Sequence, residues 1–167
     1  GSTAYAAARG TDEVLEIAVP AGTLRRRIAV GGSPGALALG PGGATMYVLL
    51  PAQGRVAVVA TAEGRTVDAI DLGAGARPAG VTVTAGGDLL LVTADAPAAQ
   101  DAGLWWIDTA TNEVAGTSRG LGLGAGIAAT GDGRFAYATG SGGDVLTAIN
   151  LETGRRFLDI PLGSAPQ

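Results

Sequence analysis

The chain of 167 residues contains no cysteine, no histidine and no lysine. Without cysteine and histidine it lacks the thiolate and imidazole ligand sets that hold zinc, copper or haem iron, and it lacks thiol nucleophiles and imidazole bases. Without lysine no Schiff base forms on a lysine side chain. These absences argue against an enzyme, and the sequence predicts no catalytic residue, no metal site and no cofactor.

Basic residues are also in the minority. Eleven arginines face 15 acidic residues, and the formal net charge is −4. A negative surface repels nucleic acid and anionic lipid. The run Arg25-Arg26-Arg27 does not reverse this, because alternation along a strand splits its side chains between two faces. Because of this charge we expect no nucleic-acid partner. No apolar run reaches the length that crosses a bilayer, so we also expect no membrane insertion of this segment.

What the chain does contain is one short phrase that recurs four times. Its phase markers are Tyr5, Tyr47, Leu91 and Tyr137, which follow one another at intervals of 42, 44 and 46 residues. A period of about 40 to 45 residues is typical of β-propeller blades. The sequence therefore predicts an all-β fold, a β-propeller of about four blades or a segment of a larger propeller.

Each repeat divides into four antiparallel strands, which in the second repeat we expect near 36–39, 46–50, 55–60 and 67–72. The first repeat begins at its second strand, so the chain should form about fifteen strands. Residues 1–2 precede the repeats and are interpreted as a tag remnant. Residues 3–167 are predicted to form one propeller domain or partial propeller, with blades at about 3–33, 34–77, 78–123 and 124–165.

Turn chemistry and strand composition support this register. Runs such as 46–50 and 104–107 are apolar on both faces, as expected for strands between two neighbouring blades, whereas the fourth strands are polar. Adjacent Trp105 and Trp106 should point to opposite faces of their strand. One should pack between blades, and the other should either pack between blades as well or be exposed as an aromatic contact. A turn slot between the third and fourth strands accepts only glycine or asparagine, which predicts a left-handed backbone; it holds Gly22, Gly64, Asn112 and Gly154.

Three stretches resemble the YVTN-repeat β-propeller family: Met46-Tyr47-Val48, the segment from Trp106 to Val114, and the segment from Ile149 to Gly154. The resemblance covers essentially the whole chain, and its motifs are structural. It implies a propeller related to bacterial surface-layer and exported proteins, and therefore an extracytoplasmic location, secreted or in the cell envelope. Similar propellers occur in lactonases and in streptogramin lyases, but the lyases rely on histidine, which this chain lacks.

The first repeat has no first strand, and the sequence stops where another first strand would begin. Two interpretations stay open: the chain is a segment of a longer propeller, or it closes as a compact ring with one three-stranded blade. An unpaired inner strand exposes backbone groups to which another chain can add. A homodimer through the incomplete blade is therefore a hypothesis.

Propeller geometry places the connections between second and third strands, and between one blade and the next, on a common loop face. Four additional residues between Leu91 and Leu104 fall there, and loops carry function more often than scaffold strands. The partner, a protein or a small molecule, is not identified by these residues, and a solvated loop without a role is the alternative. The candidate contact residues are Asp95, Gln100, Asp101, Arg77, Gln53, Asp12 and Asp144.

The function that these observations favour is a non-enzymatic binding or interaction scaffold, exported or attached to the cell envelope. A lactonase-like or other hydrolase that uses Asp95, Asp101 or Asp144 is the first alternative. Two carboxylates within about 5 to 10 Å, one with a raised pKa, would favour the hydrolase, and their dispersal would favour the scaffold. The second alternative is the extracellular sensor domain of a membrane receptor.

Overall fold

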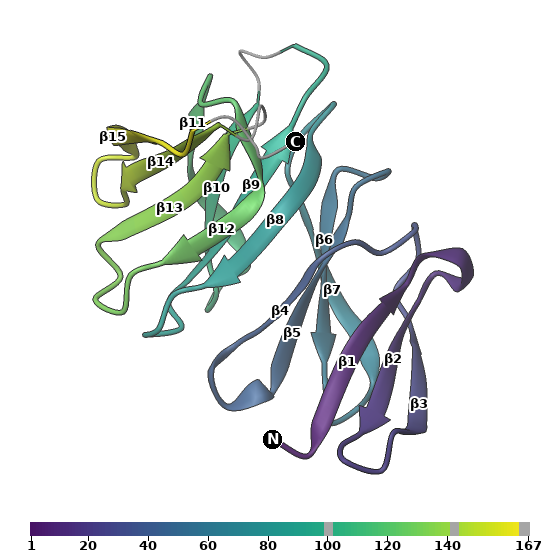
Figure 1. Cartoon of the computed structure of the whole chain (residues 1–167). Coiled ribbons are helices and arrows are strands. Elements are labelled where there is room, and N and C mark those ends of the chain that lie inside the picture. The colour runs from purple at the N-terminus through teal and green to yellow at the C-terminus, as the bar shows by residue number, and fades with distance from the viewer. Residues whose placement is uncertain (99–101, 141–143, 164–167) are drawn as a thin grey trace.

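The structure of the chain is a computed structural model that describes residues 1–98, 102–140 and 144–163. Within these ranges 15 strands form four antiparallel sheets, and two three-residue 3-10 helices, η1 (Arg9–Thr11) and η2 (Pro41–Gly43), lie between strands. Figure 1 shows the four sheets side by side along an open arc. The predicted all-β, propeller-like fold with about fifteen strands is confirmed.

Each sheet is one blade, and its strands follow one another in chain order. The first blade contains β1 (Thr3–Ala8), β2 (Glu13–Ala18) and β3 (Thr23–Ala29), and the second contains β4 (Leu37–Leu39), β5 (Thr45–Leu50), β6 (Arg55–Ala60) and β7 (Arg65–Asp71). The third contains β8 (Arg77–Val83), β9 (Leu89–Asp95), β10 (Gly103–Asp108) and β11 (Glu113–Arg119), and the fourth contains β12 (Leu123–Ala129), β13 (Phe135–Gly140), β14 (Val145–Asn150) and β15 (Arg155–Pro161).

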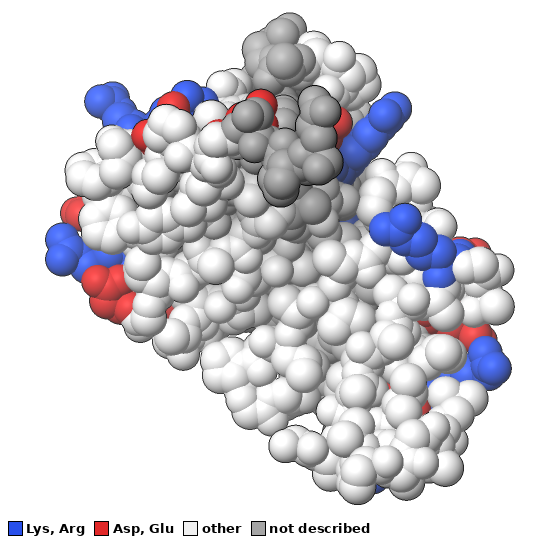
Figure 2. All heavy atoms as spheres, in the orientation of Figure 1, with Lys and Arg blue, Asp and Glu red and all other residues white. Residues whose placement is uncertain are grey.

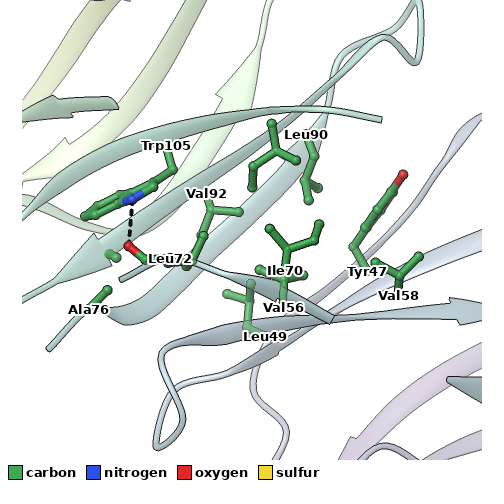
Figure 3. Close-up of a cluster of buried hydrophobic side chains, with 12 residues drawn as sticks. Tyr47, Leu49, Val56, Val58, Ile70, Leu72, Ala76, Leu90, Val92 and Trp105 are labelled. Carbon is green, nitrogen blue, oxygen red and sulfur yellow. Dashed lines mark hydrogen bonds between the residues drawn. The ribbon is translucent and has the colours of Figure 1, made fainter. Parts of the chain in front are cut away.

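Three hydrophobic cores lie between successive blades. In β5, Met46 and Val48 pack toward the first blade, whereas Tyr47 and Leu49 pack toward the third, so both faces of this strand are covered as its apolar run predicts. Figure 3 shows the core between the second and third blades. The core between the third and fourth blades contains Leu91, Leu104, Leu123, Ala136, Ala138, Ile149 and Leu151.

The two tryptophans occupy different cores. Trp105 is buried between the second and third blades, where its Nε1 donates a hydrogen bond to the Leu72 carbonyl at 3.1 Å (Figure 3). Trp106 points the other way and packs against the core between the third and fourth blades. The predicted opposition is confirmed, and both indoles lie between blades.

The outermost strands are largely exposed, as their polar composition predicts. In all four blades the pairing of the third strand with the outermost strand contains a register shift, for example between Glu16 and Ile17 and between Val58 and Val59. A bulge of this kind bends the strand and increases its twist. The shift was not predicted, because it depends on pairing rather than on composition.

The arginine run divides as alternation predicts. Arg27 forms an ion pair with Glu13 within the first blade, with 2.9 Å between Nη1 and Oε2. Arg26 donates from Nε to Glu16 Oε2 at 2.9 Å and from Nη2 to the Thr61 carbonyl of the second blade at 2.7 Å. Arg26 therefore joins two blades. Across residues 1–98, 102–140 and 144–163 there is no helix long and apolar enough to span a membrane.

Candidate functional site

The loop face of the first three blades carries two adjoining hollows. The larger has a volume of about 940 Å³ and lies between the β5–β6 loop and the connection from β7 to β8. The smaller, of about 440 Å³, also includes loop residues of the first blade. Because both hollows are lined by Pro51, Ala52 and Arg77, we treat them as one groove. This groove is the candidate site.

A close approach of two loops forms the floor of the larger hollow. The Leu72 N–H donates to the Gly54 carbonyl at 3.0 Å. Gly54 has a φ of +65°, and a Cβ placed there would lie 2.9 Å from the Ala76 carbonyl oxygen. Only glycine combines this backbone conformation with this proximity. Gly54 thus holds the β5–β6 loop against the β7–β8 connection.

An ion pair forms one wall of the larger hollow. Arg55 Nη2 lies 3.2 Å from Asp71 Oδ2, and the Gly73 N–H donates to Asp71 Oδ1 at 2.8 Å. The hydrogen bond from Gly73, followed by the one from Arg55, lowers the pKa of Asp71. Asp71 is therefore a carboxylate at neutral pH, whereas a general acid needs a raised pKa.

Two arginines in the groove form no hydrogen bond or ion pair with the described residues. Arg77 lines both hollows, and Arg9 lines the smaller one beside Asp95 and Ser33. Both arginines are exposed, and neither has a hydrogen bond or ion pair within the described part of the chain. Arg77 and Asp95 are directly paired positions of β8 and β9. The smaller hollow therefore offers two guanidinium groups beside one carboxylate.

The other predicted contact residues are distributed over the loop face. Gln53 lines the larger hollow, and its side chain lies over Gly32 of the β3–β4 connection. Asp12 accepts a hydrogen bond from the Ser33 N–H at 2.7 Å, so it fixes that same connection. Asp144 lines a third hollow of about 320 Å³. Gln100 and Asp101 lie outside the described residues.

The structure brings Arg77, Gln53 and Asp95 to one groove and places Asp144 elsewhere, because the third hollow shares no lining residue with the other two. Arg9 was not singled out from the sequence, although its loop was predicted to lie on this face. The signal was weak, since only the fold brings β1 and β8 to the same hollow. In the described ranges no three acidic residues converge to hold a metal ion.

Fold and groove define a propeller-like module with a ligand-sized hollow on its loop face. The structure is similar to that of hydrazine synthase from Kuenenia stuttgartiensis, which contains a β-propeller, with a TM-score of 0.82 and 21% sequence identity. The match covers 97% of this chain and 46% of that chain, so this chain spans about half its length. At this identity the likeness shows the fold alone. No protein-family profile and no curated protein matches the sequence.

Proposed function

We propose that this chain is a non-enzymatic binding module whose groove accepts an acidic segment of a partner protein. The observation that carries the proposal is the position of Arg9 and Arg77, two exposed guanidinium groups that line one hollow and have no partner among the described residues. A guanidinium group binds a carboxylate through two parallel hydrogen bonds, and this geometry gives specificity as well as affinity.

The charge of the whole chain favours this groove over other surfaces. With a net charge of −4, the chain repels an acidic segment over most of its surface. Five other arginines, at positions 26, 27, 55, 65 and 156, already form ion pairs with carboxylates of this chain. Arg9 and Arg77 form no ion pair within the described residues, so they provide the attraction inside the groove. Volumes of about 940 and 440 Å³ are in the range of ligand sites.

The distribution of carboxylates supports binding rather than hydrolysis. Asp71 lines only the larger hollow, Asp95 only the smaller hollow, and Asp144 the third. Asp71 also has a lowered pKa, which suits a fixed charge rather than a proton donor. A pair of catalytic carboxylates would need to share one hollow. Nucleic acid is not proposed as a partner, because phosphate repels a chain of this charge.

The proposed location is extracytoplasmic, in the cell envelope or secreted. It rests on the resemblance to YVTN-repeat propellers, together with a propeller-like fold in which the resembling stretches lie on β5, from β10 through the turn into β11, and from the end of β14 into the turn that follows it. Fractionation of cells that produce the full-length native protein tests this part. Recovery of the protein only with cytosolic markers would contradict it.

Binding of a glutamate-rich peptide tests the groove. We expect Arg77→Ala to weaken binding about tenfold, because a hydrogen bond to a charged group contributes about 1.5 to 3 kcal/mol. The control is Arg65→Ala, since Arg65 forms an ion pair with Glu63 on the turn side of the second blade, away from the groove. Amide chemical-shift changes in titrations measure both affinities.

The shifts themselves give a second readout. The peptide should perturb the backbone amides of residues 52–54, 73–77 and 79, which line the groove, and added salt should weaken the complex. Equal affinity of Arg77→Ala and Arg65→Ala, or perturbations confined to the opposite face, would refute the proposal.

A further inference from the structure

The two ends of the arc expose apolar sheet faces. On the fourth blade, Tyr137 of β13 lies on the same sheet face as Leu158 and Ile160 of β15, with β14 between the two strands, and all three are exposed. Phe157 is also exposed and contacts Phe135, with ring centroids 5.6 Å apart. No other described blade covers this face. Contiguous apolar patches of this kind mark interaction surfaces.

The second blade shows that the equivalent face is buried when a neighbouring blade packs against it. Positions 90 residues apart are equivalent in the second and fourth blades, because the strand pairings coincide: Tyr47 pairs with Val58, and Tyr137 with Ala148. In the second blade these positions are buried against the third blade. The equivalent pairs, with their exposed fractions, are Tyr47 (3%) and Tyr137 (36%), Ile70 (4%) and Ile160 (36%), and Leu72 (4%) and Leu162 (53%).

The first blade exposes the complementary half of the same kind of interface. Its outer face carries Ala4 and Ala6 of β1 opposite Ile17 and Leu15 of β2. The same pairing in the third blade places Leu90 opposite Ile107 and Val92 opposite Trp105. Those four residues of the third blade pack against the second blade. The described blades thus leave exposed one face of second-blade type and, on the opposite side of the arc, one face of third-blade type.

From this we infer that a second copy of the chain covers both faces by head-to-tail docking, the fourth blade of each copy packing on the first blade of the other. Two such contacts close a ring of about eight blades, within the range of known propellers.

The turn slot between third and fourth strands gives an independent argument. Each slot after the first is in contact with a side chain of the preceding blade: Arg26 lies over Gly64, Asn112 Nδ2 donates to Asp68 Oδ2 at 2.9 Å, and Trp106 lies over Gly154. At Gly22, in the first blade, a Cβ would meet no atom within 4 Å.

The fourth blade carries a residue that fits this vacant slot. Leu158 pairs with Ala148 as Asp68 pairs with Val58, so Leu158 and Asp68 are equivalent positions. Leu158 is exposed. In the docked pair, Leu158 of one copy lies over Gly22 of the second copy, as Arg26 lies over Gly64 within one chain.

Light scattering after size-exclusion chromatography tests the proposal over a range of concentrations. The wild-type chain of 16.3 kDa should elute at twice that mass. Tyr137→Arg blocks the face of the fourth blade and Ala6→Arg the face of the first; both positions are exposed, so the fold tolerates the change. Each should raise the dissociation constant of the dimer about 30-fold, the size of an interface hot-spot loss. Circular dichroism confirms that the variants fold.

Mixing the two variants distinguishes this arrangement from other dimers. In a mixture, the unchanged first-blade face of Tyr137→Arg can dock on the unchanged fourth-blade face of Ala6→Arg. An equimolar mixture should therefore form a heterodimer at concentrations at which each variant alone is monomeric. Val67→Arg, at an exposed position on the outer strand β7, should leave the dimer intact. A monomer at all concentrations, or a dimer unaffected by Ala6→Arg, would overturn the proposal. Assemblies larger than a dimer that Tyr137→Arg dissociates would show that the first and fourth blades dock but that two copies do not close into a ring. That result would overturn the two-copy ring.

Discussion

The glycines in the turn slot between third and fourth strands have two physical requirements. Gly22, Gly64 and Gly154 have φ values of +67°, +66° and +66°, and Asn112 has +58°, as the sequence predicted. In addition, the slot is a contact point between blades, since a Cβ on Gly154 would lie 2.4 Å from the Trp106 ring. The positive φ at this position favours glycine in every blade. The lack of space for a Cβ requires glycine only at Gly64 and Gly154, because Gly22 has no neighbouring atom within 4 Å of that position.

Alanine substitution separates the two requirements. Gly22→Ala should reduce the free energy of unfolding by about 1 to 2 kcal/mol, the strain of a left-handed backbone. Gly154→Ala should cost a further 1 to 3 kcal/mol, roughly the cost of overpacking, because the Trp106 ring cannot move aside freely. Urea unfolding measures both. Equal losses would show that the contact with Trp106 contributes nothing.

Two aspartates next to threonines carry a pH dependence. The Thr84 hydroxyl donates to Asp88 Oδ1 at 2.6 Å, which is the main cause of the lowered pKa of Asp88. In the fourth blade the Thr130 hydroxyl likewise donates to Asp132 Oδ1, which is the main cause of the lowered pKa of Asp132. Since the folded pKa lies below the unfolded one, the stabilisation is present above the unfolded pKa of about 4 and is lost as the pH falls through the folded pKa.

Thr84→Val should therefore raise the pKa of Asp88 and leave that of Asp132 unchanged. Carboxyl carbon shifts followed by NMR from pH 6 down to about pH 2, across the ordinary aspartate range, measure both groups in one sample. Parallel movement of the two pKa values would contradict a local hydrogen bond as the cause.

At the scale of elements, most of the strands could be predicted, because apolar runs and turn residues are local signals. The range expected at 55–60 coincides with β6, and 36–39 differs from β4 by one residue. The fourth strand of that repeat was expected at 67–72 but runs from Arg65 to Asp71. It contains a bulge at Val67, which is set by the pairing with β6 and leaves no local signal in the sequence. The groove was only partly predictable, because Arg9, Pro51 and Arg77 come from three blades and meet only in the folded chain.

The hydrogen bond from Trp105 joins β10 to the end of the second blade. Trp105→Phe should lower the free energy of unfolding by about 1 to 3 kcal/mol more than Trp106→Phe, because it leaves the buried Leu72 carbonyl unsatisfied. The two substitutions remove the same atoms, and the Trp106 indole has no hydrogen bond within the described residues. Thermal unfolding compares them. A larger loss for Trp106→Phe would show that packing between the third and fourth blades dominates.

At the scale of the whole molecule, stability is divided among three cores instead of one. Each core is shared by two successive blades, and Figure 1 shows the arrangement of the four sheets. Figure 2 shows that most of the visible surface is uncharged and that the charged residues lie mainly at its edges. In such an array, the effect of one substitution depends on where along the chain of neighbours it falls.

Removal of one buried side chain should therefore act differently at the end and in the middle. Ile149→Ala and Leu49→Ala each create a cavity and should cost about 2 to 5 kcal/mol. Ile149→Ala should increase hydrogen exchange mainly in β12–β15, whereas Leu49→Ala, between the second and third blades, should increase exchange in the strands on both sides. Identical exchange patterns would show that the blades open together.

The turn slot also constrains how the blades could have diverged after duplication. Arg26 with Gly64, Asp68 with Asn112 and Trp106 with Gly154 are three chemically different solutions at one recurring joint. A substitution on either side of a joint calls for a matching substitution on the other, one blade further along. Homologues of this chain should therefore show coevolution across each joint, and a blade transplanted to another place in the order would meet a joint shaped for a different side chain.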